Sequence, residues 1–132
     1  MTEIKHLKNE DYTTTKWSGG STTQLYIHPI PANYSERDFD FRLSTATVDI
    51  EQSVFTSLPG IQRELMILDG SMQVVHNGHY SVTLQPYDID SFQGDWSTKG
   101  FGRCVDFNLM TRLPYSGKLK ILKIKNKQQV WI

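Results

Sequence analysis

Short runs of alternating apolar and polar residues, separated by turn residues, make up most of the 132-residue sequence. Such alternation places successive side chains on opposite faces of a β-strand. The clearest example spans residues 38–49, where two sets of side chains face opposite ways. One face carries Phe39, Phe41 and Leu43, and the other carries Arg42, Ser44, Ala46 and Val48. No segment shows a sustained apolar period of 3.6 residues, so we expect little helix.

The other predicted strands lie between turn signals such as Pro29, Asp69-Gly70 and Pro86. In chain order they are 22–28, 64–68, 72–75, 80–84, 89–92, 101–110, 119–125 and 130–132, which makes about nine strands in all. The segment 76–79, His-Asn-Gly-His, predicts a hairpin with a type I′ turn. Because a hairpin tip is normally solvated, we expect both histidines to be exposed and their replacement by Ala to be nearly neutral.

The order of strands and turns over residues 63–92 is typical of a cupin-type jelly roll. We therefore predict an all-β fold, a cupin-like antiparallel jelly-roll barrel with little helix. The length fits a single domain over residues 1–132. The interior of such a barrel can hold a small ligand.

Composition narrows the classes of partner. Fourteen basic residues balance fourteen acidic ones. The lysines at 118, 120, 123, 125 and 127 alternate with apolar residues, as on the solvent face of a strand, so a nucleic-acid partner is disfavoured. No apolar run approaches the roughly 20 residues that span a bilayer, and residues 1–10 resemble no signal peptide. We expect no membrane partner and a cytoplasmic location.

The sequence also argues against a metal or another cofactor. No two histidines have the His-x-His spacing that places two imidazoles on one strand face. The position of the Glu ligand in the first cupin signature is Arg63 here, and a guanidinium repels a cation. The second signature reads Pro86, Asp88 and Ser91, without its His. Cys104, the single cysteine, lies in an apolar context that predicts a buried, inert thiol.

Two arginines are the candidate binding groups. Arg42 lies in mid-strand opposite the apolar face, and Arg63 opens the next core strand. An inward-facing arginine must be paired or must bind something, because an unpaired buried charge is very costly. Asp106 and Asp88 are the candidate internal partners. The other possibility is that both arginines converge on one cavity and bind a carboxylate through their planar forks of donors.

Other polar residues could complete a site. Asp106, Asn108 and Met110 alternate and therefore share a face, and an Asn amide suits an amide or formyl group. The alternative for Asn108 is a bond to nearby backbone. Gly19 and Gly20 either allow close approach to a ligand or form only a turn. No Gly-x-Ser-x-Gly elbow is present, so no catalytic residue is assigned.

Several segments together resemble the HutD/Ves family. They are 17–25, 38–46, Phe55 with 58–63, 68–70, 92–96 and 106–112, and their order and spacing over about residues 12–112 carry the resemblance. The chain resembles a shortened form, because family members commonly continue into a second cupin-like half. The tryptophan motif has Ser18 where the family usually has Asn.

The resemblance implies a cupin-like fold and a regulatory role in histidine utilisation, sensing a small acid such as N-formylglutamate. The pocket residues it implies are Trp17, Thr22, Arg42, Ser44, Arg63, Asp106 and Asn108. We therefore expect a metal-free protein that binds a small anionic metabolite, and the sequence leaves a homodimer open. The alternatives are a cupin-type isomerase or hydrolase acting in the same pocket, and an interaction module with a filled barrel.

Overall fold

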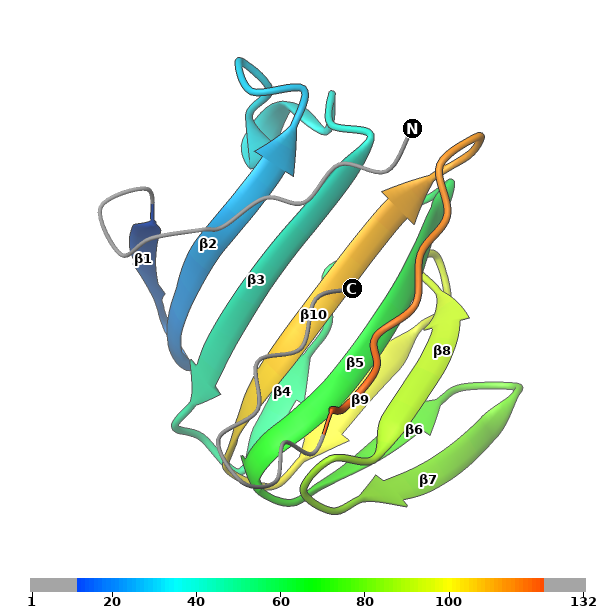
Figure 1. Cartoon of the computed structure of the whole chain (residues 1–132). Coiled ribbons are helices and arrows are strands. Elements are labelled where there is room, and N and C mark those ends of the chain that lie inside the picture. The colour runs from blue at the N-terminus through cyan, green and yellow to red at the C-terminus, as the bar shows by residue number, and fades with distance from the viewer. Residues whose placement is uncertain (1–11, 123–132) are drawn as a thin grey trace.

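The computed structural model describes residues 12–122, which form ten β-strands and one short 3-10 turn (Figure 1). The 3-10 turn is η2, Tyr34–Glu36. The strands are β1 Thr13–Trp17, β2 Gly20–His28, β3 Phe41–Val48, β4 Gln52–Val54, β5 Ile61–Gly70, β6 Met72–His76, β7 Tyr80–Leu84, β8 Ile89–Gln93, β9 Thr98–Phe101 and β10 Cys104–Arg112. The all-β prediction with little helix is confirmed.

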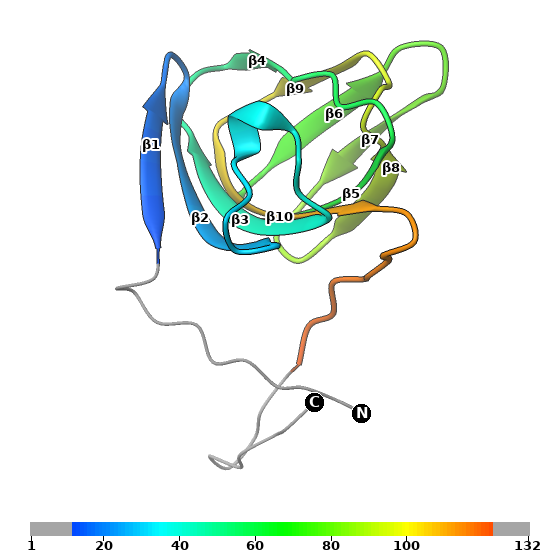
Figure 2. The same ribbon diagram turned by 90° about the horizontal axis from the view of Figure 1, so that it is seen from above.

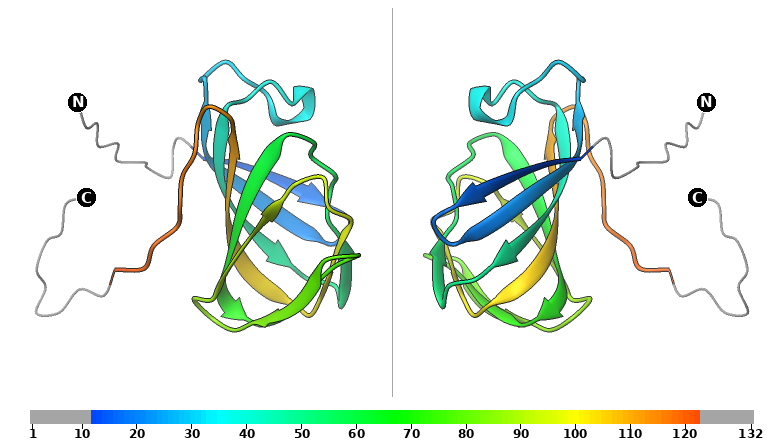
Figure 3. Two further views of the ribbon diagram at one scale, coloured as in Figure 1. Left: turned by 90° about the vertical axis from the view of Figure 1, so that its right-hand side faces the viewer. Right: turned by 90° about the vertical axis from the view of Figure 1, so that its left-hand side faces the viewer.

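The strands form two antiparallel sheets that face each other. One sheet has the order β1-β2-β3-β10-β5-β8, and the other has the order β4-β9-β6-β7. Seen from above, the sheets enclose a common interior, and the loop that carries η2 crosses one end of it (Figure 2). The side views show the strands of both sheets curving around this interior (Figure 3). Curvature of this kind lets two sheets share one core.

The register of β3, β10 and β5 arranges the inward residues in rows across the sheet. In one row Met110 lies between Arg42 and Arg63, its partners on the two neighbouring strands. The next row aligns Ser44, Asn108 and Leu65, and the third aligns Ala46, Asp106 and Ile67. Alternation in β3 and β10 therefore brings the polar residues of two strands onto one interior surface.

Apolar residues fill the interior in two clusters. The larger cluster joins both sheets and consists of Val48, Leu65, Ile67, Met72, Val74, Leu84, Phe92 and Cys104. The smaller one lies under the η2 loop and consists of Ile27, Phe39, Leu58, Ile61 and Met110. Burial raises the pKa of the Cys104 thiol to about 12, as expected for an inert buried cysteine. The described residues contain no helix long and apolar enough to cross a membrane.

Some strand predictions were wrong. The predicted strand 101–110 is two strands, because the chain turns at Gly102, whose φ is 124° and whose added Cβ would lie 2.6 Å from the Ser71 carbonyl oxygen. Residues 119–122 are not a strand. They follow the outer face of the first sheet, where the Leu119 N–H donates to Glu64 Oε1 at 2.8 Å. The end of the predicted strand 119–125 and all of 130–132 lie outside the described residues.

The hairpin lies where it was predicted, but the predicted exposure of His76 was wrong. The strands β6 and β7 pair as expected, and His79 is exposed. His76 is only 2% exposed, because it continues the inward alternation of Met72 and Val74. The turn is not type I′, since Gly78 has a positive φ of 80° and Asn77 does not.

Candidate ligand-binding site

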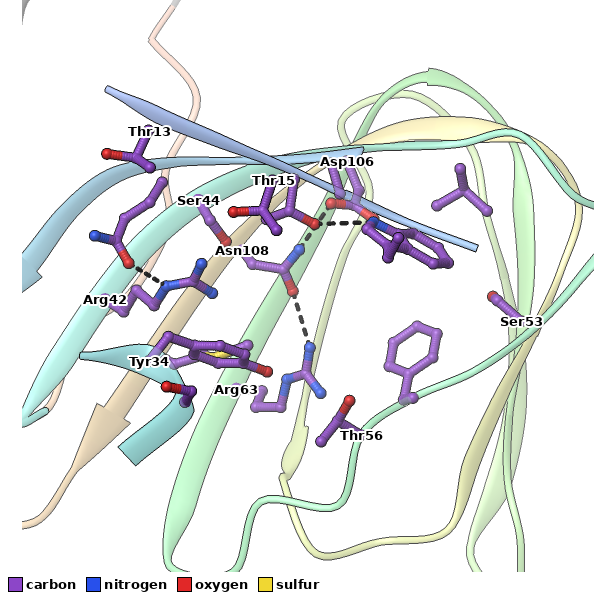
Figure 4. Close-up of a pocket in the computed structure, with 18 of the residues that line it drawn as sticks. Thr13, Thr15, Tyr34, Arg42, Ser44, Ser53, Thr56, Arg63, Asp106 and Asn108 are labelled. Carbon is purple, nitrogen blue, oxygen red and sulfur yellow. Dashed lines mark hydrogen bonds between the residues drawn. The ribbon is translucent and has the colours of Figure 1, made fainter. Parts of the chain in front are cut away.

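A cavity of about 620 Å³ lies between the two sheets, and all seven residues predicted from the sequence line it (Figure 4). They come from five strands: Trp17 from β1, Thr22 from β2, Arg42 and Ser44 from β3, Arg63 from β5, and Asp106 and Asn108 from β10. The cavity also touches both apolar clusters, through Val48, Met72 and Met110. The structure thus brings the set together, and its role in binding remains a prediction.

Arg42 is held by one amide and one aromatic ring. Its Nε donates to Gln24 Oε1 at 2.8 Å, and its Cζ lies 4.0 Å from the centre of the Tyr34 ring. A guanidinium over a ring face gains a cation–π interaction. Burial lowers the pKa of Arg42, but a guanidinium stays charged in proteins. None of these contacts neutralises its charge.

Arg63 is as buried as Arg42, and one of its donors is unsatisfied. Its Nη2 donates to Asn108 Oδ1 at 3.3 Å, while its buried Nε has no hydrogen-bond partner within residues 12–122. Its Cζ lies 5.3 Å from the ring centres of Phe55 and of Phe92. Burial lowers the pKa of Arg63, although nearby Asp106 acts in the opposite direction. A buried donor without a partner costs about 1–3 kcal/mol, and more when it is charged.

Asn108 connects Arg63 to Asp106. Its Oδ1 accepts from Arg63, and its Nδ2 donates to Asp106 Oδ1 at 2.7 Å. Both ends of the amide are therefore engaged by the protein. Burial raises the pKa of Asp106 to about 7, although Arg63, the backbone N–H of Ala46 and the Asn108 amide all act in the opposite direction. The carboxyl group of Asp106 faces the cavity from its inner wall (Figure 4).

The prediction that Asp88 is a partner of the arginines was wrong. It lies exposed in the turn before β8, where its Oδ2 accepts from the Gln85 N–H at 2.9 Å. The turn brings Asp88 back to its own backbone, so its carboxylate cannot reach either arginine. Among the described residues, the pairs of a basic with an acidic side chain are His76 with Asp90 and Arg103 with Glu51, and neither pocket arginine belongs to one.

The wall made by β1 and β2 is neutral and rich in hydroxyl groups. Trp17 Nε1 donates to Thr22 Oγ1 at 3.1 Å, and Thr13 and Thr15 also line the cavity. The two glycines between these strands form the turn and do not line the cavity. An added Cβ at Gly20 would lie 1.9 Å from the Thr47 carbonyl oxygen, so this glycine permits close strand packing.

Sequence reasoning missed several lining residues. Tyr34 comes from the η2 loop, and its hydroxyl points toward Arg63 while its ring covers Arg42 (Figure 4). No periodic signal marks a loop residue of this kind. The strands β1 and β4, which supply Thr13, Thr15 and Ser53, were also unpredicted. Gln24 could have been found, because it alternates with Thr22 along a predicted strand.

The donor set of the cavity does not suit a cation. Within the described part of the chain, no three His, Cys, Asp or Glu side chains gather as metal ligands. Two guanidinium groups line the cavity, whereas a metal site would require neutral imidazoles or carboxylates. The absence of a bound metal remains a prediction.

The two facing sheets define a class of protein, the cupin-like fold. Ectoine synthase from P. lautus and oxalate decarboxylase from Lactobacillus farciminis share this fold at 9% and 10% identity. They match 84% and 88% of this chain and 78% and 36% of their own, with TM-scores of 0.63 and 0.61. At such identity the likeness shows the fold alone.

The family model of HutD matches residues 9–131, and the chain belongs to the HutD family. HutD from Pseudomonas fluorescens SBW25, solved in a "formate condition", is 28% identical with a TM-score of 0.69 over 81% of this chain. A conserved protein of unknown function from Pseudomonas aeruginosa PAO1 is also 28% identical, with a TM-score of 0.72 over 85% of this chain. This chain spans 59% of the length of each. Comparison with the curated proteins finds no match.

Membership of the family relates this cupin-like protein to histidine utilisation.

Proposed function

We propose that the protein binds a small carboxylate in this pocket, without a metal, as a sensor or regulator. One observation carries the proposal: two buried arginines line a single cavity and, among the described residues, no carboxylate forms an ion pair with either. The proposal places the protein in the cytoplasm and treats a formylated or acidic amino-acid derivative as the ligand class.

The cost of buried charge supports an anionic ligand. Arg42 and Arg63 are each 7% exposed and lie in one row of the sheet on either side of Met110. Their Cα atoms are therefore separated by two strand spacings, on the order of 10 Å. Both side chains reach the same cavity, so one ligand can meet both forks of donors. A carboxylate bound to the terminal nitrogens of these arginines would supply the counter-charge that the described residues do not.

The remaining walls suit the rest of such a ligand. A volume of about 620 Å³ falls within the usual range for small-molecule sites. The hydroxyl groups of Thr15 and Thr22 and the Trp17 indole offer hydrogen bonds and an apolar surface beyond the arginines.

A thermal-shift and calorimetry screen tests the proposal. Formate, glutarate and N-formylglutamate are compared with the methyl esters or amides of the same acids. We expect the acids to raise the melting temperature and the uncharged analogues to leave it unchanged. Absence of binding by any acid at any pH between 6 and 8 would refute the proposal.

Variants identify the site of binding. Arg63→Met keeps similar length without the charge, and we expect it to fold and to lose the response to acids. Arg103→Met is the matched control, because Arg103 is exposed and pairs with Glu51 away from the cavity. An equal response of both variants would show that the acids bind elsewhere.

An isomerase or hydrolase acting in the same pocket is a second candidate, and one observation favours it. Burial raises the pKa of Asp106 to about 7, which is the range of an effective general acid or base. Incubating the bound acid with the protein and analysing it by mass spectrometry or NMR distinguishes the two functions. An unchanged ligand supports a sensor, and a chemically changed one supports an enzyme.

A further inference from the structure

Asp106 is an unusual member of the pocket because it is an acid at an anion-binding site. It is 4% exposed and lies on the inner wall, in the row that also holds Ala46 and Ile67. Its Oδ1 accepts from the Asn108 amide, and the Ala46 backbone N–H is its other partner. Both partners are neutral. Within the described chain no cation contacts this carboxyl group, although two hydrogen bonds through Asn108 link it to Arg63.

We propose that Asp106 determines the affinity of the pocket for acids by taking up a proton when an acid binds. This inference rests on the proposed function. An ionised Asp106 and a bound carboxylate would be two anions in one small cavity, sharing the influence of Arg63. Protonation of Asp106 removes that repulsion and supplies an O–H donor to the ligand. Asp106 is thus a specificity-determining residue, which favours ligands that present an acceptor toward it.

The groups around Asp106 leave it as the group that titrates in the neutral range. Arg63 from β5 and Arg42 from β3 remain charged throughout it. Cys104 on β10 has a pKa raised by burial to about 12, and Tyr34 is the titratable residue from the η2 loop. The other lining residues of β1, β2, β4 and β6 are neutral: Thr13, Thr15, Trp17, Thr22, Gln24, Ser53, Val54 and Met72.

The expected size of the effect follows from linkage. The burial that raises the pKa of Asp106 to about 7 leaves it largely ionised at pH 8 and largely protonated at pH 6. Small carboxylic acids remain ionised over this whole range. If a bound anion raises the pKa of Asp106 by a further one unit or more, linkage makes binding roughly five- to tenfold tighter at pH 6 than at pH 8.

Calorimetry with N-formylglutamate and glutarate at pH 6, 7 and 8 tests the inference on the whole wild-type chain. Repeating each titration in two buffers of different ionisation enthalpy counts the protons taken up on binding. We expect uptake of up to one proton per ligand at pH 7–8, falling toward zero at pH 6. Binding that is equally tight across this range and takes up no proton would overturn the inference and leave the proposed function standing. Failure of every acid to bind would overturn the proposed function itself.

The variant Asp106→Asn assigns the proton to its residue. It is isosteric and cannot ionise, so we expect its affinity to stay constant from pH 6 to pH 8 with no proton uptake. Asp95→Asn is the matched control, because Asp95 is exposed and does not line the cavity; it should keep the wild-type pH dependence. Persistence of that dependence in Asp106→Asn would assign the proton to another group and overturn the inference. Should Asp106→Asn fail to fold, the proton count on the wild type still decides.

Discussion

Two largely buried polar clusters in this protein contain similar side chains, but only one of them borders the cavity. The pocket cluster consists of Arg42, Arg63, Asp106 and Asn108, and it borders a cavity. The closed cluster consists of His76, Tyr80, Asp90 and Thr98, and none of these residues lines that cavity. Each cluster contains an acid and a basic side chain, on the paired strands β5 and β10 in the pocket and on strands of different sheets, β6 and β8, in the closed cluster. The difference lies in how completely the protein satisfies them.

The closed cluster is complete within the protein. His76 Nε2 lies 2.7 Å from Asp90 Oδ2, and its Nδ1 lies 2.7 Å from Thr98 Oγ1. The Tyr80 hydroxyl donates to the other oxygen of Asp90 at 2.6 Å. The rings of Tyr80, Phe92 and Trp96 surround the imidazole. Every polar atom of the imidazole has a partner, so this cluster stabilises the fold and has no need of a ligand.

The pocket cluster leaves its charge uncompensated. Asn108 separates Arg63 from Asp106, and a buried nitrogen of Arg63 has no partner among residues 12–122. Burial of polar residues does not by itself indicate a binding site. A cavity beside an incompletely satisfied set of polar residues is the stronger indication, because a ligand can supply what the protein does not.

The largest expected loss of stability comes from disrupting the hydrogen bonds of the closed cluster. His76→Ala removes both hydrogen bonds of the imidazole and leaves the Asp90 carboxylate buried beside a void. We expect a loss of about 3–5 kcal/mol in the free energy of unfolding, measured by urea denaturation. His79→Ala is the control in the same hairpin, where His79 is exposed and stacks on Trp96, and it should change stability by no more than about 1 kcal/mol. Equal losses of stability in the two variants would show that the hydrogen bonds of His76 do not stabilise the fold.

Removing a charged side chain from the pocket should not destabilise the protein, in contrast to removing His76 from the closed cluster. Arg63→Met removes a buried charge that lacks full compensation, so the ligand-free protein should be as stable as the wild type or more stable. The ligand-dependent stabilisation, roughly 2.7 kcal/mol at a hundredfold excess over Kd, should disappear. Thermal melts with and without glutarate measure both quantities. A strongly destabilised apo variant would show that Arg63 is structural.

The substitution Asp106→Asn should make the free energy of unfolding of the protein less dependent on pH. A folded-state pKa raised to about 7 means that the unfolded chain releases this proton near pH 4, while the folded chain keeps it until pH 7. Asp106 therefore lowers the free energy of unfolding as pH rises from 4 to 7. We expect Asp106→Asn to be more stable than the wild type by about 4 kcal/mol at pH 8, with the gain vanishing near pH 4. Urea titrations at both pH values measure the difference, and a constant difference would show that Asp106 ionises normally.

The smallest expected effect tests the rim of the closed cluster. Tyr80→Phe removes the hydroxyl that donates to Asp90 and keeps the ring against His76 and Trp96. The loss should be about 1–2 kcal/mol, since an acceptor that is charged and buried loses one of its donors. Acid binding should be unchanged, because Tyr80 does not line the cavity. A change in ligand affinity would show that the two clusters are coupled.

Much of the pocket was predictable from the sequence by itself. Period-two alternation in residues 38–49 assigned Arg42 and Ser44 to the face opposite Phe41, and the same rule grouped Asp106 with Asn108. These assignments are local properties of one strand, because each side chain's face follows from its neighbours along the chain. The turn signals likewise located the hairpin of β6 and β7 and the strand β8.

The tertiary structure alone decided which polar residues are satisfied. His76 shares its face with Met72 and Val74, but only the pairing of distant strands brings Asp90 and Thr98 to its two nitrogens. In the same way, the position of Arg63 beside Asn108, rather than in contact with Asp106, depends on the register between β5 and β10. Register and loop placement arise from packing of the whole barrel, and no local pattern encodes them. For this reason the sequence identified the charges of the pocket, and only the fold showed that they lack partners.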